Sequence, residues 1–258
     1  MTNCIKKYSL SISLLLSLCL SQAHAASVVR CAFDIGSSET KVSAARITGS
    51  EVEPLFRKLV KLPTKKTVKD GTLPESTVNE LTQKLGELKA LCEQQGATEF
   101  VGGATSGLRA ATNNGAQALA KVAADNGIQL RIVNGDEEAL LGYKAVEGEY
   151  REKYGTQSHI VVWDIGGGSM QFATRALNSV TDADFIVRSL PVGGTSFLDQ
   201  LIAKTKRNEG ATLSPISNGE IFNSIFDARS LSAGVPKAIR DILLFDKNVQ
   251  VIGVGGLH

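Results

Sequence analysis

The alternation of apolar and polar positions predicts regular elements along most of the chain. Residues 28–35, 40–48 and 52–62 are three short strand-like runs joined by tight turns, which is typical of a β-meander. From Pro74 to Gln95, valine and leucine recur at helical spacing, and Gly96 follows, so we expect an amphipathic helix there.

The same pattern continues as strands and helices in turn. Further strands are expected at 99–104, 128–133, 160–165, 170–175, 185–190 and 249–254, and further helices at 115–126, 135–150, 216–230 and 236–244. Strands that alternate with helices indicate an α/β fold in which helices cover the sheets.

One short pattern occurs twice. Residues 33–38 (FDIGSS) and 163–169 (WDIGGGS) each follow an apolar run and precede another strand. Their aspartates, Asp34 and Asp164, are 130 positions apart. A repeat at that distance predicts two similarly built domains rather than a solenoid.

The repeated turns suggest phosphate chemistry. Glycine lets backbone N–H groups approach an anion closely, although it costs conformational entropy on folding. An aspartate beside a phosphate is repelled unless a cation lies between them, so Asp34 and Asp164 predict a divalent metal. The alternative is a pair of glycine-rich hairpins without a ligand. We expect the two turns to face each other across a cleft.

Other segments add anion-binding candidates. Residues 105–109 (TSGLR) place hydroxyls and an arginine at a helix start, which suits an oxyanion, although ordinary capping also explains them. Residues 193–197 (GGTSF) form a third glycine turn. Lysines 61, 65, 66 and 69 flank or occupy the expected loop 63–71, where a solvated surface is favoured over contact with a polyanion.

A group of acids opens the helix at 135. Asp136 is the expected N-cap, and Glu137 and Glu138 complement the helix dipole. One of these glutamates could instead point into the cleft and deprotonate a water. Their spacing does not choose between these interpretations.

The first 25 residues have the pattern of a signal peptide. Lys6 and Lys7 precede an apolar stretch over 10–20, and residues 23–25 (AHA) form a small-x-small cleavage site before Ala26. We expect a periplasmic or secreted protein with no stable membrane span after cleavage; the alternative is an uncleaved anchor.

Charge and cysteine content bear on the binding partner and on disulfide formation. The 28 basic and 26 acidic residues nearly balance, which gives no indication of a nucleic-acid partner. Of the four cysteines, Cys31 and Cys92 would remain after cleavage. Export would permit a disulfide, but the spacing favours none, and we expect buried free thiols.

Taken in order, these motifs resemble the exopolyphosphatase and guanosine-pentaphosphate phosphatase (Ppx/GppA) family, within the actin, sugar kinase and Hsp70 superfold. The resemblance covers about residues 28–256. It implies two ribonuclease H-like (actin-like ATPase) lobes with mixed sheets flanked by helices: 26–150 and 151–258 after a signal peptide at 1–25. The second lobe is expected to be truncated, because the family continues beyond the glycines at 255–256.

The resemblance also implies roles for individual residues. Glu138 would be the catalytic base, and Asp34 and Asp164 would bind Mg²⁺. The phosphate-binding residues would be Gly36, Ser37, Ser38, Arg109, Gly166, Gly167, Gly168, Ser169, Gly194 and Thr195. In place of the glutamate that the family usually carries seven residues after its second aspartate, this chain has Gln171, which has no charge.

Three hypotheses follow from these observations. The first is an exported phosphohydrolase that removes terminal phosphate from polyphosphate or a nucleotide polyphosphate. The second is a phosphate- or polyphosphate-binding protein whose catalysis is weakened by Gln171. The third, an ATP-dependent kinase of the same superfold, is disfavoured because ATP is scarce outside the cytoplasm. A homodimer is left open.

Overall fold

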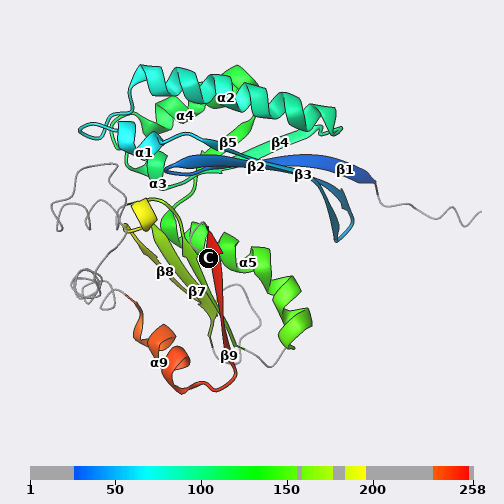
Figure 1. Cartoon of the computed structure of the whole chain (residues 1–258), viewed down its shortest axis with the longest axis vertical. Helices are drawn as coiled ribbons and strands as arrows, with labels where there is room; N and C mark the ends of the chain where they lie inside the picture. Colours follow the sequence, from blue (N-terminus) through cyan, green and yellow to red (C-terminus); the bar gives the residue numbers. More distant parts are fainter. Residues whose placement is uncertain (1–25, 156–158, 177–183, 196–234, 256–258) are drawn as a thin grey trace, which may run out of the picture.

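The chain forms two sheets, each covered by helices, which lie one above the other in Figure 1. The computed structural model describes residues 26–155, 159–176, 184–195 and 235–255. The expected signal peptide and the expected helix at 216–230 lie outside these residues. In the part of the chain that is described, no helix is both long and apolar enough to cross a membrane.

The first sheet has five strands in the order β3-β2-β1-β4-β5. β1 to β3 form the antiparallel meander that the sequence predicts, and β4 and β5 add in parallel. The strands are β1 (Ser27–Ile35), β2 (Glu39–Thr48), β3 (Glu51–Lys61), β4 (Glu99–Ala104) and β5 (Gln129–Ile132). The helices of this lobe are α1 (Thr64–Thr67), α2 (Glu75–Gln94), α3 (Ser106–Arg109) and α4 (Gly115–Asn126).

Helix α2 covers this sheet with the apolar face that its periodicity predicts. Leu81, Leu85 and Leu88 are buried in one cluster with Phe33 and Ile35 of β1. Burying each such side chain stabilises the fold by about 1.5–3 kcal/mol. This packing holds β1 in place, and β1 carries Asp34 close to its carboxyl end.

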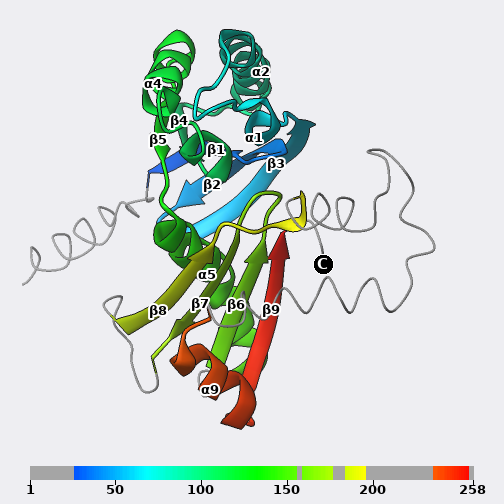
Figure 2. The same cartoon turned by 90° about the vertical axis from the view of Figure 1, so that its left-hand side faces the viewer.

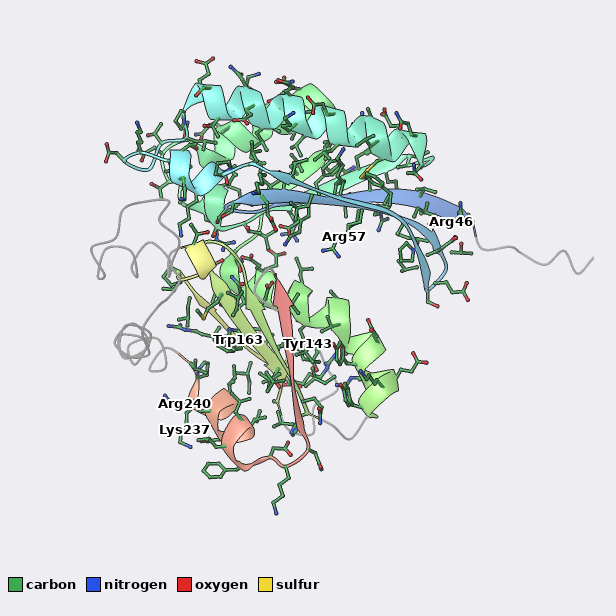
Figure 3. All side chains as sticks on the ribbon, viewed as in Figure 1. Arg46, Arg57, Tyr143, Trp163, Lys237 and Arg240 are labelled. Carbon is green, nitrogen blue, oxygen red and sulfur yellow. A yellow bond between two sulfur atoms is a disulfide. The ribbon has the colours of Figure 1, made fainter. Side chains whose placement is uncertain are left out.

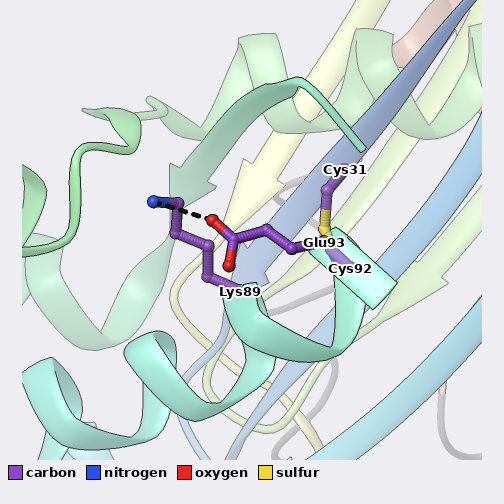
Figure 4. Close-up of a disulfide and its surroundings, with 4 residues drawn as sticks. All are labelled: Cys31, Lys89, Cys92 and Glu93. Atoms are coloured by element: carbon purple, nitrogen blue, oxygen red, sulfur yellow. Dashed lines mark ion pairs between the residues drawn. A yellow bond between two sulfur atoms is a disulfide. The ribbon is translucent and has the colours of Figure 1, made fainter. Parts of the chain in front are cut away.

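The expectation of free thiols at Cys31 and Cys92 is wrong. The two residues form a disulfide with an S–S distance of 2.04 Å between β1 and α2, next to the surface ion pair of Lys89 and Glu93 (Figure 4). Both cysteines are fully buried. Spacing could not reveal this pair, because the residues are 61 positions apart and meet only when α2 packs on the sheet.

The second sheet has four strands in the order β8-β7-β6-β9, seen most clearly in Figure 2. β9 pairs with β6 in parallel, and the other neighbours are antiparallel. The elements are α5 (Gly135–Tyr154), β6 (His159–Ile165), β7 (Met170–Arg175), β8 (Phe185–Leu190), α9 (Lys237–Phe245) and β9 (Val249–Gly255).

Helices lie on both faces of this second sheet. Ile160 and Val162 of β6 are buried in one cluster with Tyr143 of α5, while Val161 between them is buried with Ile239 of α9. Alternation along a strand sends neighbouring side chains to opposite faces, which explains the two clusters. Tyr143, labelled in Figure 3, meets the ring of Phe185 edge-on at 4.8 Å between centroids.

Helix α5 differs from its predicted form in three ways. It extends to Tyr154 rather than ending near residue 150. Its N-cap is Asn134, whose side chain accepts from the N–H of Glu137, so Asp136 is not the cap. It also packs against β6, β7 and β8 of the second sheet. Most of the helix nevertheless lies within residues 26–150, which the sequence assigns to the first lobe.

The repeat in the sequence corresponds to a repeat in the topology. Asp34 pairs with Lys41 on the antiparallel neighbour of β1, and Asp164 pairs with Gln171 on the antiparallel neighbour of β6. Each strand also has one parallel partner, β4 or β9. The tight turns that follow close alike, with Gly36 N–H donating to Glu39 O and Gly166 N–H to Ser169 O, both at 2.9 Å.

Candidate functional site

The two repeated turns face each other across a pocket of about 330 Å³ between the lobes. Except for Arg109, every site residue expected from the sequence lines it. These residues are Asp34, Gly36, Ser37, Ser38, Glu138, Asp164, Gly166, Gly167, Gly168, Ser169, Gly194 and Thr195. The pocket is also lined by Glu39, Lys41, Thr105, Ser106, Ile165 and Gly255.

Glycines allow the turns to approach each other. A Cβ on Gly167 would overlap the hydroxyl of Ser38, and a Cβ on Gly168 would overlap those of Ser37 and Ser106. A side chain at either position would force these hydroxyl groups to rotate out of their present hydrogen bonds. Close approach, rather than a left-handed backbone, explains the glycines at these two positions.

Hydroxyl groups connect the turns around the pocket. Ser37 is hydrogen-bonded to Ser106, and Ser38 Oγ lies 3.1 Å from Thr195 Oγ1, which belongs to the third glycine turn. In addition, Thr195 N–H donates to the carbonyl of Gly167 at 2.9 Å. The three glycine-containing turns thus form one continuous polar surface.

Four carboxyl groups line this pocket, those of Asp34, Glu39, Glu138 and Asp164. Burial raises the pKa of Glu138, the Arg109 guanidinium opposes that rise, and the negative charges of Asp164 and Asp34 add to it. Burial likewise raises the pKa of Asp34, with Lys41 opposing and Asp164 adding. Because 54% of the Asp34 side chain is exposed, water screens much of its shift. Mutual repulsion of this kind would be relieved by a bound cation.

Asp34 and Asp164 could hold magnesium if water and substrate phosphates supply the remaining ligands. Among the described residues, no group of three or more His, Cys, Asp or Glu side chains could hold a metal ion. Mg²⁺ commonly uses one or two carboxylates and completes its octahedron with water and substrate phosphates. Asp34 and Asp164, each near the end of a central strand, suit that arrangement, with oxygen ligands and no sulfur or imidazole.

Arg109 lies beside the pocket rather than in its lining. Its Nη2 donates to Oε2 of Glu138 at 2.7 Å, and its Nη1 donates to the carbonyl of Val133 at 2.6 Å. Its Nη2 is also 3.5 Å from Ser169 Oγ. The arginine therefore orients the expected base, a contact that the spacing of the motifs did not reveal.

Two lysines lie near the turns, and of these only Lys41 was not among the residues considered from the sequence. Lys41 lines the pocket, with its Nζ 4.0 Å from Asp34 and 3.5 Å from Glu39. Lys65 donates to the carbonyl of Gly168 at 2.9 Å, so the expectation of a purely solvated loop is wrong for this residue. The loop also contains the short helix α1. Strand pairing of Lys41 with Asp34 was the one signal that could have identified the first lysine.

Gln171 is buried behind the second turn. Its Nε2 donates to Ser169 Oγ at 2.9 Å and to Ser189 Oγ at 3.3 Å. Its Oε1 is buried without a hydrogen-bond partner among the described residues. The residue is 1% exposed, so a charged side chain at this position would be buried.

Comparison with known proteins identifies the family of this chain. The Ppx/GppA phosphatase family matches residues 44–212. The chain belongs to this family. Over 128 residues it is 29% identical to "Exopolyphosphatase 1" of Mycobacterium leprae and equally to that of Mycobacterium tuberculosis strain H37Rv. The match covers 49% of this chain and 35% of each relative, about a third of their length.

Solved structures show the same actin-like fold. A Ppx/GppA family member of Aquifex aeolicus has a TM-score of 0.64 at 22% identity, covering 90% of this chain and 67% of that one. An exopolyphosphatase of Cytophaga hutchinsonii has a TM-score of 0.67 at 16% identity, covering 88% of this chain and 67% of the other. At these identities the likeness concerns the fold.

Proposed function

We propose that this chain removes the terminal phosphate from polyphosphate by attack of water. The observation that carries the proposal is the convergence of Glu138, Asp34 and Asp164 on one pocket whose other walls are glycine turns and hydroxyls. The names of the curated relatives favour polyphosphate over a nucleotide polyphosphate.

In this reaction, Glu138 and Arg109 would act on the attacking water. Glu138 holds the attacking water and accepts its proton, and Arg109 keeps the carboxylate oriented. The oxygen of the water bonds to the terminal phosphorus as the bond to the bridging oxygen breaks. The products are orthophosphate and a polyphosphate shorter by one unit.

The turns would hold the phosphate that is transferred. The N–H groups of Gly36 and Gly166 already close their own turns, so the donors proposed for phosphate oxygens belong to residues 37–38 and 167–168. Asp34 and Asp164 would hold Mg²⁺, which when bound neutralises charge on the phosphate oxygens. Reactions of this class depend mainly on such positioning and electrostatics.

Phosphate release from long-chain polyphosphate tests the proposal. We expect release by the wild-type protein in MgCl₂, none in EDTA, and release slower by orders of magnitude for the Glu138→Gln variant. Equal rates for wild type and variant would reject Glu138 as the base.

A second candidate function is binding without hydrolysis. It is favoured by Gln171, which places an uncharged amide opposite Asp164. Calorimetry that detects polyphosphate binding, together with no phosphate release in MgCl₂, would select this alternative.

We also propose that the protein is exported. The buried disulfide between Cys31 and Cys92 supports this proposal, because such bonds persist in oxidising compartments. Mass spectrometry of the protein recovered from cells tests it, with Ala26 expected at the mature N-terminus.

A further inference from the structure

The described parts of the two sheets have four edge strands: β3, β5, β8 and β9. An edge strand carries a row of backbone N–H and C=O groups outside the ladder, and these can pair with a strand of another molecule. Natural proteins protect such edges with charged side chains, proline, bulges or short length. In this chain three of these edges have such protection and β9 does not.

The three protected edges differ in how they are blocked. β3 contains Pro54, five charged side chains and a register shift against β2. β5 is only four residues long and includes the charged Arg131. β8 has the charged Arg188 within its six residues. Each of these strands is therefore a poor template for a further strand.

β9 has a regular and uncharged edge. Its seven residues, VQVIGVG, contain no proline and pair with β6 along their whole length without a register shift. On the side away from β6, no strand of the described residues pairs with it, and it is the red outer strand in Figure 2. Val251 on this strand is 54% exposed. The edge of β9 is therefore suited to a further strand.

An identical strand fits this edge. Two copies related by a two-fold axis perpendicular to the sheet pair antiparallel, and an axis at Ile252, the central residue of β9, pairs all seven residues. Val251 of each copy then lies opposite Gly253 of the other, so the exposed valine meets a position without a side chain. Like charges opposite each other would destabilise such a pair, and β9 contains none.

The same axis preserves the two faces of the sheet. Val251 pairs with Val161 of β6, which is buried in one cluster with residues of α9, whereas Ile252 is buried in one cluster with residues of α5. A two-fold axis perpendicular to the sheet leaves each face on its own side. Ile252 therefore meets its own counterpart on the α5 face, and Val251 contributes to the junction on the α9 face.

We propose that two copies of this chain associate through antiparallel pairing of their β9 strands. The two four-stranded sheets then form one sheet of eight strands. Gly255, at the end of β9, lines the carboxylate pocket of its own copy. Because Gly255 is three positions from the axis in each copy, the two pockets are about 20 Å apart along the junction. Association therefore does not depend on the proposed hydrolysis.

Sedimentation equilibrium of the purified full chain tests the association. We expect a reversible monomer–dimer equilibrium in the micromolar range, because a junction of one strand pair is small. Val251→Lys adds a charge at an exposed position of the edge and should weaken association by about tenfold or more. The matched control Val52→Lys changes a valine on β3 that is 64% exposed, and it should associate as the wild type does.

Chemical cross-linking provides a second measurement. The Val251 residues of the two copies are diagonal neighbours across the junction, about 7–8 Å apart. In the Val251→Cys variant a short bismaleimide should therefore link two copies, whereas the Val52→Cys variant should remain unlinked. Because cysteine is close to valine in size, this variant tests the junction even if Val251→Lys fails to fold.

Four outcomes would overturn the proposal. A wild-type protein that stays monomeric at every concentration would leave the β9 edge to another segment of the chain or to another protein. If the two lysine variants associate equally strongly, or if the two cysteine variants are linked equally, the interface lies elsewhere. Irreversible growth beyond the dimer would exclude a closed two-fold pair.

Discussion

Arg109 and Glu138 form a partly buried ion pair, with Nη2 of the arginine 2.7 Å from Oε2 of the glutamate. The arginine is itself fixed by its bond to the carbonyl of Val133. The pair orients the carboxylate, yet burial still raises the pKa of Glu138. A carboxyl group that is held in place and has a raised pKa is suited to proton transfer.

Replacing Glu138 by glutamine should reduce phosphate release by about 10²- to 10⁴-fold, the usual contribution of general base catalysis. The amide keeps an acceptor for Arg109, so polyphosphate affinity measured by calorimetry should change little. Glu137→Gln is the matched control, because Glu137 pairs with Arg131 outside the pocket lining. A comparable loss of activity in that control would contradict the assignment.

The raised pKa of Glu138 also predicts a pH effect on stability. A carboxyl whose pKa is higher in the folded state stabilises the fold below its unfolded pKa, and this contribution is lost as pH rises through the folded value. The melting temperature of wild type, relative to Glu138→Gln, should therefore fall between about pH 4 and neutrality. A constant difference across that range, measured by calorimetric melting, would exclude the shift.

Gln171→Glu should couple stability to magnesium. The new carboxylate would be buried opposite Asp164, at a cost of about 2 kcal/mol, or roughly 5 °C in melting temperature, in EDTA. MgCl₂ should raise the melting temperature of the variant more than that of the wild type. If magnesium affects both proteins equally, position 171 does not influence metal binding.

The disulfide should contribute substantially to stability. Closing a loop between residues 61 positions apart stabilises a fold by about 4 kcal/mol in the chain-entropy model. Dithiothreitol should lower the free energy of unfolding in urea by that order. The double variant Cys31→Ala, Cys92→Ala should be destabilised similarly, and dithiothreitol should not change its stability further. If dithiothreitol destabilises the variant as well, the loss seen in the wild type does not come from this disulfide.

Gly193 should not tolerate a side chain. A Cβ there would overlap the backbone of Gly166, Gly167 and Gly168, which cannot move without opening the second turn. Gly193→Ala should therefore lower the melting temperature and weaken polyphosphate binding. Gly148→Ala is the control: it has open space on α5 and should stabilise the protein by about 1 kcal/mol. Equal effects of the two substitutions would contradict the crowding seen at Gly193.

Much of the fold was determined by local sequence pattern. The apolar stripe of α2, the meander of β1 to β3 and the paired aspartate turns all depend on residues close together in the chain. Periodicity and turn chemistry act over such short distances, so these features could be predicted. The repeat of Asp34 and Asp164 further indicated two lobes that share a site.

Only the tertiary structure decided the contacts between distant segments. It determined that Cys31 meets Cys92, that Arg109 orients Glu138 and that Lys65 reaches Gly168. It also placed Gln171 so that, among the described residues, its buried Oε1 has no hydrogen-bond partner. Such contacts depend on how helices pack on sheets and how the lobes face each other. Those arrangements arise from the sum of many weak interactions, which no single stretch of sequence encodes.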